Sequence, residues 1–420
     1  MRTIGTSRRR SGSRRRSYQL FSTTGAAIAL LGFVGLAAPA VAQAEPTASP
    51  ARPSMPLTAP PILDAASAPV VYDGSGFATV TTDIVGNVLL FTEANGSDTW
   101  TETKLYDAGQ GTGVYDPAIA TDGNGTLGIV ATETGSGQGY LLSWIGQVGG
   151  SFTQEVVADD QAYDTNPSIA YSPTGENFVM TDIDAGGNVD YWYSTTAAGG
   201  WVEQAGIATN DSQWSQAVIT TTDVGVVIVV TNATASGGLP QGQAVVTENW
   251  YQPYFSSGWS YAGGVNFDDY GLSIAWTGSE ILLASAQTGH NYGQPASIKF
   301  MALQQMNDTG GYLSYGQKIA GHAVTGSTSI AWSAPGSNAV VTYQSGNALY
   351  LSYSNTTVTS FTTEKVKANT ATTVYADYPS VVVGNDTVQI TDATTDGKHL
   401  YGFSQPVGGI VWPRQTIYTG

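Results

Sequence analysis

The stretch Pro167-Ser168-Ile169-Ala170, a short apolar strand followed by the turn Ser172-Pro173-Thr174-Gly175, decides the fold because it recurs along the chain. Six further copies begin at Pro69, Pro117, Gln216, Leu272, Thr328 and Pro379. Counted from the second residue of each copy, the successive spacings are 48, 50, 49, 56, 56 and 51 residues. Seven copies at a period of about 50 residues predict a repeat protein.

Each repeat contains four short strand-like segments. In the third repeat they cover 168–171, 177–181, 189–194 and 201–207, separated by turns rich in Gly, Pro and Asn. Alternating apolar residues and β-branched residues favour strands in every segment. Solenoid repeats are shorter than this period, and sandwiches do not repeat so regularly. We therefore predict an all-β fold, a seven-bladed β-propeller over residues 62–420 with four-stranded antiparallel blades.

The fourth strand of every repeat begins at an aromatic residue. These residues are Trp100, Phe152, Trp201, Trp259, Tyr312, Phe361 and Trp412. In this respect the chain resembles the sialidase-like, BNR-repeat propellers, in which an Asp-box turn of the form S/T-x-D-x-G-x-x-W/F joins the third and fourth strands. The segments 194–201 and 354–361 keep the Ser and the aromatic residue of that box but lose its Asp and central Gly. The resemblance implies a lectin-like member of that superfamily, and we expect the seven aromatic residues to pack between blades.

The first 44 residues have the pattern of an export signal, which we predict for them. Seven arginines lie between Arg2 and Arg16, a small apolar stretch follows, and Val41-Ala42-Gln43-Ala44 supplies a cleavage site of the A-x-A type. The general and the twin-arginine export routes both remain open. Residues 45–61 hold six prolines and form a stiff spacer or a leader without a role of its own. We expect a secreted, extracellular protein.

The charge of the remaining chain excludes several partners. After residue 44 the sequence contains eight Lys or Arg against 32 Asp or Glu, a net charge of −24. Nucleic acid and anionic membrane surfaces are poor partners for such a chain, and we expect no membrane insertion of the mature protein. The absence of cysteine means that burial of apolar surface, not disulfides, must stabilise an exported protein.

The end of each second strand carries a carboxylate or an amide. In chain order these residues are Asp83, Glu133, Asp182, Asn232, Gln287, Gln344 and Asp392. The four carboxylates fall in blades 7, 1, 2 and 3, which would be contiguous in a closed propeller. They are candidate groups for binding sugar hydroxyls or for acid–base chemistry. The alternative is that they cap the following turn or connect adjacent blades by hydrogen bonds.

In five repeats an aromatic residue lies in the loop that leads into the first strand. These residues are Tyr115, Tyr163, Trp214, Tyr270 and Tyr378, several of them beside Asp residues. In a four-stranded meander the first strand begins at the end where the second strand finishes, so these aromatics and the seven polar residues should share a face. Aromatic rings that stack on sugar C–H groups beside carboxylates predict a neutral-glycan site. The alternative is that they are aromatic residues at the edge of the core.

Several chemistries are excluded or only weakly indicated. Binding of a sialic acid carboxylate requires an arginine cluster, and after the signal only Arg52 and Arg414 remain. There is no G-x-S-x-G motif and no thiol nucleophile, and three scattered histidines do not predict a zinc site. No cofactor is expected. A low-specificity Ca²⁺ candidate is the acidic loop with Asp182, Asp184, Asn188 and Asp190.

Three functions stay open at this point. With the four strands of each repeat called A to D in chain order, the favoured one is a secreted, lectin-like propeller that binds a neutral glycan on the face formed by the D–A and B–C loops. The second is a glycoside hydrolase or polysaccharide lyase, whose catalytic carboxylates would come from Asp83, Glu133, Asp182 and Asp392. The third is a structural or adhesive cell-surface protein. Binding is favoured because of the predicted face of aromatic and acidic residues, the seven similar repeats and the missing arginines.

Overall fold

A computed structural model describes residues 68–108, 112–135, 138–158, 165–184, 187–196, 199–208, 214–222, 225–232, 242–250, 260–267, 269–287, 297–305, 312–320, 327–346, 348–356, 358, 360–370, 373–375, 378–409 and 411–419. The export signal at 1–44 and the spacer at 45–61 lie outside these residues. Their assignments therefore stay predictions.

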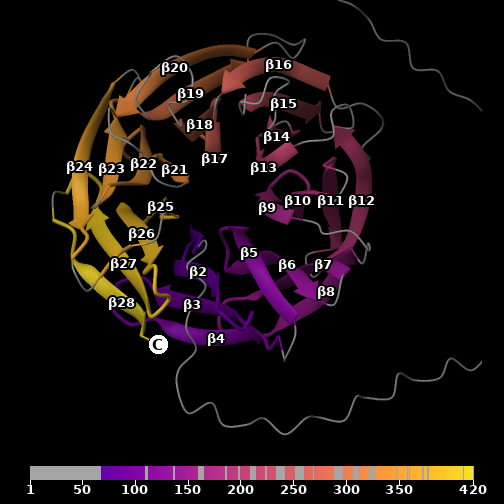
Figure 1. Ribbon diagram of the computed structural model, residues 1–420, viewed down its shortest axis with the longest axis horizontal. Helices are drawn as coiled ribbons and strands as arrows, with labels where there is room; N and C mark the ends of the chain where they lie inside the picture. Colours follow the sequence, from indigo (N-terminus) through magenta and orange to yellow (C-terminus); the bar gives the residue numbers. More distant parts are fainter. Residues whose placement is uncertain are drawn as a thin grey trace, which may run out of the picture. The chain divides into compact units, whose positions relative to one another are not determined.

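The described residues form seven four-stranded antiparallel sheets, and in every sheet the strand order follows the chain (Figure 1). Sheets 1 to 3 are β1 (Val70–Tyr72), β2 (Gly76–Thr82), β3 (Val88–Ala94) and β4 (Thr101–Tyr106); β5 (Thr112–Thr121), β6 (Thr126–Gly135), β7 (Gln138–Gln147) and β8 (Phe152–Ala158); β9 (Thr165–Ser172), β10 (Asn177–Ile183), β11 (Val189–Thr196) and β12 (Gly199–Ala208). Sheets 4 and 5 are β13 (Trp214–Thr221), β14 (Gly225–Asn232), β15 (Gly242–Trp250) and β16 (Ser260–Phe267); β17 (Asp269–Trp276), β18 (Glu280–Gln287), β19 (Ser297–Gln305) and β20 (Tyr312–Ala320). Sheets 6 and 7 are β21 (Thr328–Ser333), β22 (Asn338–Ser345), β23 (Ala348–Ser354) and β24 (Phe361–Ala368); β25 (Ser380–Gly384), β26 (Thr387–Ala393), β27 (His399–Pro406) and β28 (Arg414–Thr419). The predicted all-β class and the four-stranded antiparallel units are confirmed.

The four strands of a sheet are called A to D in chain order. The A–B end of a sheet is the end at which strand A turns into strand B, and the B–C end is the opposite one. Among the described residues no helix is present that could span a membrane.

The recurring Ser of the repeat motif connects neighbouring sheets. Ser168 Oγ accepts the backbone N–H of Ile219 at 3.2 Å, so sheet 3 is hydrogen-bonded to sheet 4. Ser329 Oγ accepts the N–H of Val381 at 3.1 Å in the same way, between sheets 6 and 7. A hydroxyl at this position satisfies a backbone donor that has no partner within its own sheet. The Ser-Ile/Val signature therefore reflects contacts between repeats.

Sheet 7 is hydrogen-bonded to sheet 1 as well. The N–H of Val70 donates to Ser380 Oγ at 3.1 Å. The carbonyl of Ala68, just before β1, accepts the hydroxyl of Thr79 at 3.2 Å and that of Thr391 at 2.6 Å. Residues more than 300 positions apart thus share one hydrogen-bonded boundary.

Polar bonds occur at the remaining boundaries too. Tyr106 donates to Glu133 Oε1 at 2.6 Å between sheets 1 and 2. Leu272 N donates to Gln216 Oε1 at 2.9 Å between sheets 4 and 5. Thr328 Oγ1 donates to the carbonyl of the sheet 5 residue Gly271 at 2.9 Å. With the bond from Trp201 described next, each pair of consecutive sheets shares at least one hydrogen bond.

The aromatic residues at the start of the D strands pack between sheets, as predicted. The indole N–H of Trp201 donates to Ser143 Oγ of sheet 2 at 2.8 Å, and that of Trp412 donates to Glu364 Oε1 of sheet 6 at 2.8 Å. The indole N–H of Trp100 reaches back to Gln415 Oε1 of sheet 7 at 3.3 Å. Phe152 and Phe361 lie against apolar clusters shared by two sheets. The expectation is confirmed for these five; Trp259 lies outside the described residues, and the side chain of Tyr312 is not described.

Candidate functional site

The strand registers bring the predicted aromatic and polar residues together at the B–C end. Trp214 at the start of β13 pairs directly with Asn232 at the end of β14. Asp269, beside Tyr270, pairs with Gln287. In sheet 2 Tyr115 pairs with Thr132, the residue before Glu133. The side chains of Trp214, Asn232, Tyr270 and Gln287 are not described, and Tyr163 lies outside the described residues.

Asp83 is fully buried and organises the turn between β2 and β3. Its Oδ1 accepts the backbone N–H groups of Val85 at 3.0 Å and Asn87 at 2.9 Å, and its Oδ2 accepts Asn87 Nδ2 at 2.7 Å. The oriented Asn87 in turn accepts the N–H of Ala108 at 3.0 Å. This is the turn-capping geometry typical of Asp and Asn.

Glu133 and Asp182 are also buried and bonded to aromatic side chains. Glu133 accepts the Tyr106 hydroxyl, and the pKa of Tyr106 is raised well above its usual value by burial and by that bond to a carboxylate. Asp182 Oδ1 accepts the indole N–H of Trp192 at 2.8 Å within sheet 3. Glu133 therefore connects two sheets, whereas Asp182 stiffens one.

Sheets 6 and 7 contain the last two members of the polar set. Gln344 is buried and donates from Nε2 to the backbone carbonyl of Tyr375 at 3.2 Å. Asp392 is fully buried in β26 opposite Tyr401 of β27. The described members of the polar set thus lie under the surface of the B–C end, not on it.

Exposed apolar and aromatic side chains gather at part of the B–C end. Five of the eight exposed large apolar side chains among the described residues lie there, in sheets 1 and 2 and in the segment that leads into sheet 7. They are Ile84, Val85, Tyr115, Val374 and Tyr378. Tyr115 is 41% exposed and Tyr378 is 48% exposed, which leaves their rings available to a ligand. Sequence reasoning identified the two tyrosines and missed the other three. The sequence does contain a signal for Ile84 and Val85. They are two apolar residues inside an Asp-x-x-Gly-Asn turn, where polar residues are usual.

Close backbone contacts join the sheet 1 and sheet 2 parts of this surface. A Cβ at Gly86, in the β2–β3 turn, would lie 2.5 Å from Gly113 Cα. A Cβ at Gly113 would lie 2.3 Å from the Tyr115 hydroxyl oxygen. The Tyr115 side chain therefore folds back over Gly113, beside the turn that carries Ile84 and Val85.

The predicted calcium loop is an ordinary capped hairpin in its described part. Asp184 Oδ1 accepts the N–H of Asn188 at 2.7 Å and Oδ2 accepts Asn188 Nδ2 at 2.8 Å, the same arrangement as in the β2–β3 turn. Asp182 accepts the indole N–H of Trp192, and Asp190 lies opposite Asp182 in the strand register. Within the described ranges no group of three or more His, Cys, Asp or Glu side chains is placed to hold a metal ion.

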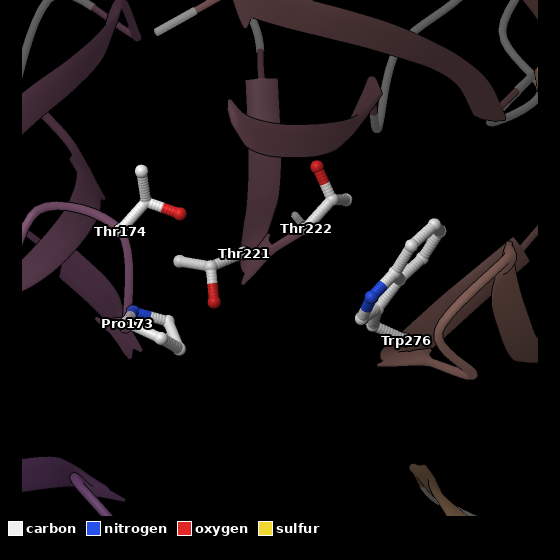
Figure 2. A pocket seen from close by; sticks show the side chains of 5 residues that line it. All are labelled: Pro173, Thr174, Thr221, Thr222 and Trp276. Atoms are coloured by element: carbon white, nitrogen blue, oxygen red, sulfur yellow. The ribbon is translucent and has the colours of Figure 1, made fainter. Parts of the chain in front are cut away.

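A small pocket lies at the opposite, A–B end, formed by sheets 3, 4 and 5 (Figure 2). Its walls are Pro173, Thr174, Thr221, Thr222 and Trp276. Thr221 is the last residue of β13 in sheet 4, and Trp276 is the last residue of β17 in sheet 5. The Thr221 hydroxyl already donates to a backbone carbonyl of sheet 3 at 2.7 Å, and Thr222 Oγ1 accepts the N–H of Gly225 at 3.1 Å. Both threonine hydroxyls therefore already bond to protein groups, whereas the indole N–H of Trp276 has no hydrogen-bond partner among the described residues.

No family model matches the chain, and no curated protein sequence matches it. Among solved structures the chain is similar to the BP39L lectin from Burkholderia pseudomallei, with 10% identity over 83% of this chain and 98% of that chain and a TM-score of 0.56. An Aleuria aurantia lectin variant in complex with Fucα1-6GlcNAc gives 12% identity, 86% and 98% coverage and a TM-score of 0.47. Another structure of that lectin is described as a six-bladed β-propeller with a novel fucose recognition mode. It gives 11% identity over 72% of this chain and 95% of that chain, with a TM-score of 0.44. The likeness to BP39L shows a shared fold. These comparisons do not support the narrower resemblance to sialidase-like, BNR-repeat propellers.

Proposed function

We propose that this chain is a secreted, non-enzymatic, seven-bladed β-propeller that binds a neutral glycan at the B–C end. The observation that carries the proposal is the group of exposed apolar and aromatic side chains in sheets 1 and 2 and in the segment that leads into sheet 7, with Tyr115 and Tyr378 among them. Aromatic rings at this degree of exposure stack on the C–H faces of sugars. The strongly acidic chain disfavours anionic polymers as ligands.

Closure into seven blades is supported by the hydrogen bonds at every boundary between consecutive sheets. The bond from Val70 to Ser380 connects the last sheet with the first. A propeller of this kind leaves no long unpaired inner edge. The lectin-type fold shared with BP39L fits a binding function on such a scaffold.

Binding is favoured over catalysis by the state of the candidate carboxylates. Glycosidases need two carboxyl groups that reach the substrate. Asp83 and Glu133 are instead buried and bonded to protein donors. We assign them to the support of the binding surface.

The test is a glycan array followed by calorimetry on the strongest neutral ligand, with a reducing-sugar assay in parallel. Replacing Tyr115 or Tyr378 by Ala should weaken binding by at least tenfold. Val411→Ala, an exposed apolar truncation remote from the B–C end, is the matched control and should bind like the unchanged protein. The proposal is contradicted if the Val411→Ala control loses glycan binding together with the tyrosine variants, or if the protein releases reducing sugar. Recovery of the protein from the medium of an expressing cell, cleaved near Ala44, tests secretion.

A further inference from the structure

Strand β5 contains a bulge directly after Tyr115. Tyr115 pairs with Thr132 and Ala118 with Val130, so Asp116 and Pro117 together face one residue of β6. Asp116 has a φ of 51°, in the left-handed region. A bulge whose first residue is left-handed bends its strand and re-aims the neighbouring side chains.

The same bulge recurs at the same place in sheets 3 and 5. In sheet 3 the two residues of the bulge that face a single residue of β10 are Asn166 and Pro167, and Asn166 has a φ of 53°. In sheet 5 they are Gly271 and Leu272, and Gly271 has a φ of 64°. Asp, Asn and Gly differ in charge and in hydrogen-bonding capacity. They are the residues that best tolerate a left-handed backbone, so the repeats retain a conformation rather than a functional group at this position.

The bulge decides which side of β5 Tyr115 occupies. Side chains alternate along a strand, so a shift of one residue moves every side chain to the opposite face. Val114 before the bulge and Ile119 after it are both buried, while Tyr115 is exposed between them. The extra residue lets both buried side chains keep their places in the core while Tyr115 faces outward.

We propose that Asp116 is a positioning residue, whose left-handed backbone rather than its carboxylate holds Tyr115 toward the ligand. This inference rests on the proposed glycan-binding function. It assigns no ligand contact to Asp116.

Four variants separate conformation from chemistry. Asp116→Gly and Asp116→Ala both remove the carboxylate and differ by one methyl group, and only Gly accepts the left-handed backbone without cost. Asp116→Asn removes the charge and keeps the tolerance, as Asn166 does in sheet 3. Asp116→Val forbids the conformation most strongly. We expect the Gly and Asn variants to bind within about twofold of the unchanged protein. The Ala variant should bind about 5- to 30-fold more weakly and the Val variant more weakly still, because the bulge must be strained before Tyr115 can engage the ligand.

A second readout does not need a ligand. Hydroxyl-radical labelling of Tyr115, measured by mass spectrometry, should be unchanged in the Gly and Asn variants and altered in the Ala and Val variants. Equal loss of binding in the Gly, Asn and Ala variants would show that the carboxylate itself contacts the ligand and would overturn the inference. Unchanged Tyr115 labelling in the Ala and Val variants would overturn it too. If the unchanged protein binds no glycan, the proposed function fails, and the labelling pattern still decides the role of Asp116.

Discussion

The backbone N–H of Val70, in the first sheet, donates a 3.1 Å hydrogen bond to Ser380 Oγ in the last sheet. The same position in sheets 3 and 6 holds Ser168 and Ser329, which accept N–H groups of the next sheet. The bond at the junction of the two chain ends is thus one example of a repeated connection. Its strength bears directly on whether the first and last sheets stay together.

Replacing Ser380 by Ala should destabilise the protein by about 1–3 kcal/mol, because the Val70 donor loses its acceptor in a partly buried site. The free energy of unfolding from a urea titration measures this. Ser279→Ala, at an exposed turn position, should change stability by less than about 0.5 kcal/mol. Equal stability of the two variants would show that the Ser380 bond contributes nothing.

Glu93 should make stability depend on pH. Burial is the main cause that raises the pKa of Glu93 to about 7; the amide of Gln415 lowers it, and the Asp98 carboxylate raises it further. The folded protein therefore holds a proton on Glu93 that the unfolded chain releases above about pH 4.5. The contribution of this proton to stability is complete below that pH and is lost as the pH rises through about 7.

Glu93→Gln should remove this part of the pH dependence and should stabilise the protein at pH 8 relative to the unchanged chain. Asp98→Asn is the companion variant and should lower the pKa of Glu93 without abolishing the dependence. Urea unfolding at pH 5, 6, 7 and 8 gives the comparison. An unchanged slope in the Glu93→Gln variant between pH 5 and 7 contradicts the prediction.

Trp412 tests the polar contacts between sheets 6 and 7. Its indole N–H and Gln405 Nε2, at 3.1 Å, both donate to Glu364 Oε1. Trp412→Phe keeps much of the ring packing and should cost about 1 kcal/mol, whereas Trp412→Ala should cost about 3 kcal/mol or more through lost packing. Thermal melts and urea titrations order the two variants. A Phe variant as unstable as the Ala variant would place the whole effect in the hydrogen bond.

Gly113 tests the position of the Tyr115 ring. A Cβ at residue 113 would meet the Tyr115 hydroxyl at 2.3 Å, so Gly113→Ala should displace the ring without burying a polar group. We expect glycan affinity to fall by about tenfold, a loss of roughly 1.4 kcal/mol, with little change in melting temperature. Tyr115→Phe removes only the oxygen, and the ring carbons Cζ and Cε2 would still lie 2.7 Å and 2.8 Å from that Cβ, so the double variant should stay as weak as Gly113→Ala. Full recovery of binding in the double variant contradicts this account.

Calcium should have little effect on the β10–β11 hairpin. The Asp184 oxygens already accept two bonds from Asn188, and Asp182 accepts the indole N–H of Trp192. A ligand that binds only the folded state raises the melting temperature by mass action. Titration of millimolar calcium onto chelator-treated protein should therefore give no shift. A clear rise, lost in Asp184→Asn, would establish a calcium site.

The repeat period and the residue classes within each repeat determined the local structure. Seven copies of the Pro-Ser-Ile-Ala type of strand, with turn residues between alternating segments, specify four strands per unit because strand and turn preferences act over a few residues. The packing role of the D-strand aromatic residues could be predicted from the sequence too, because a large apolar side chain that recurs at one position of every repeat favours burial between neighbouring sheets. Trp201 and Trp412 are indeed packed against the preceding sheet.

Only the tertiary structure decided which of the predicted site residues reach the surface. Asp83 and Glu133 were placed at the correct end of their strands, but both side chains are buried: Asp83 caps its own turn, and Glu133 accepts a hydrogen bond from Tyr106 of the preceding sheet. Tyr115 faces outward while Val114 and Ile119 are both buried, because a bulge with Asp116 in the left-handed region changes the alternation of side chains along β5. Side-chain direction in a strand reverses with a single residue, and the strand register and the neighbouring sheet set that residue count, neither of which is encoded locally.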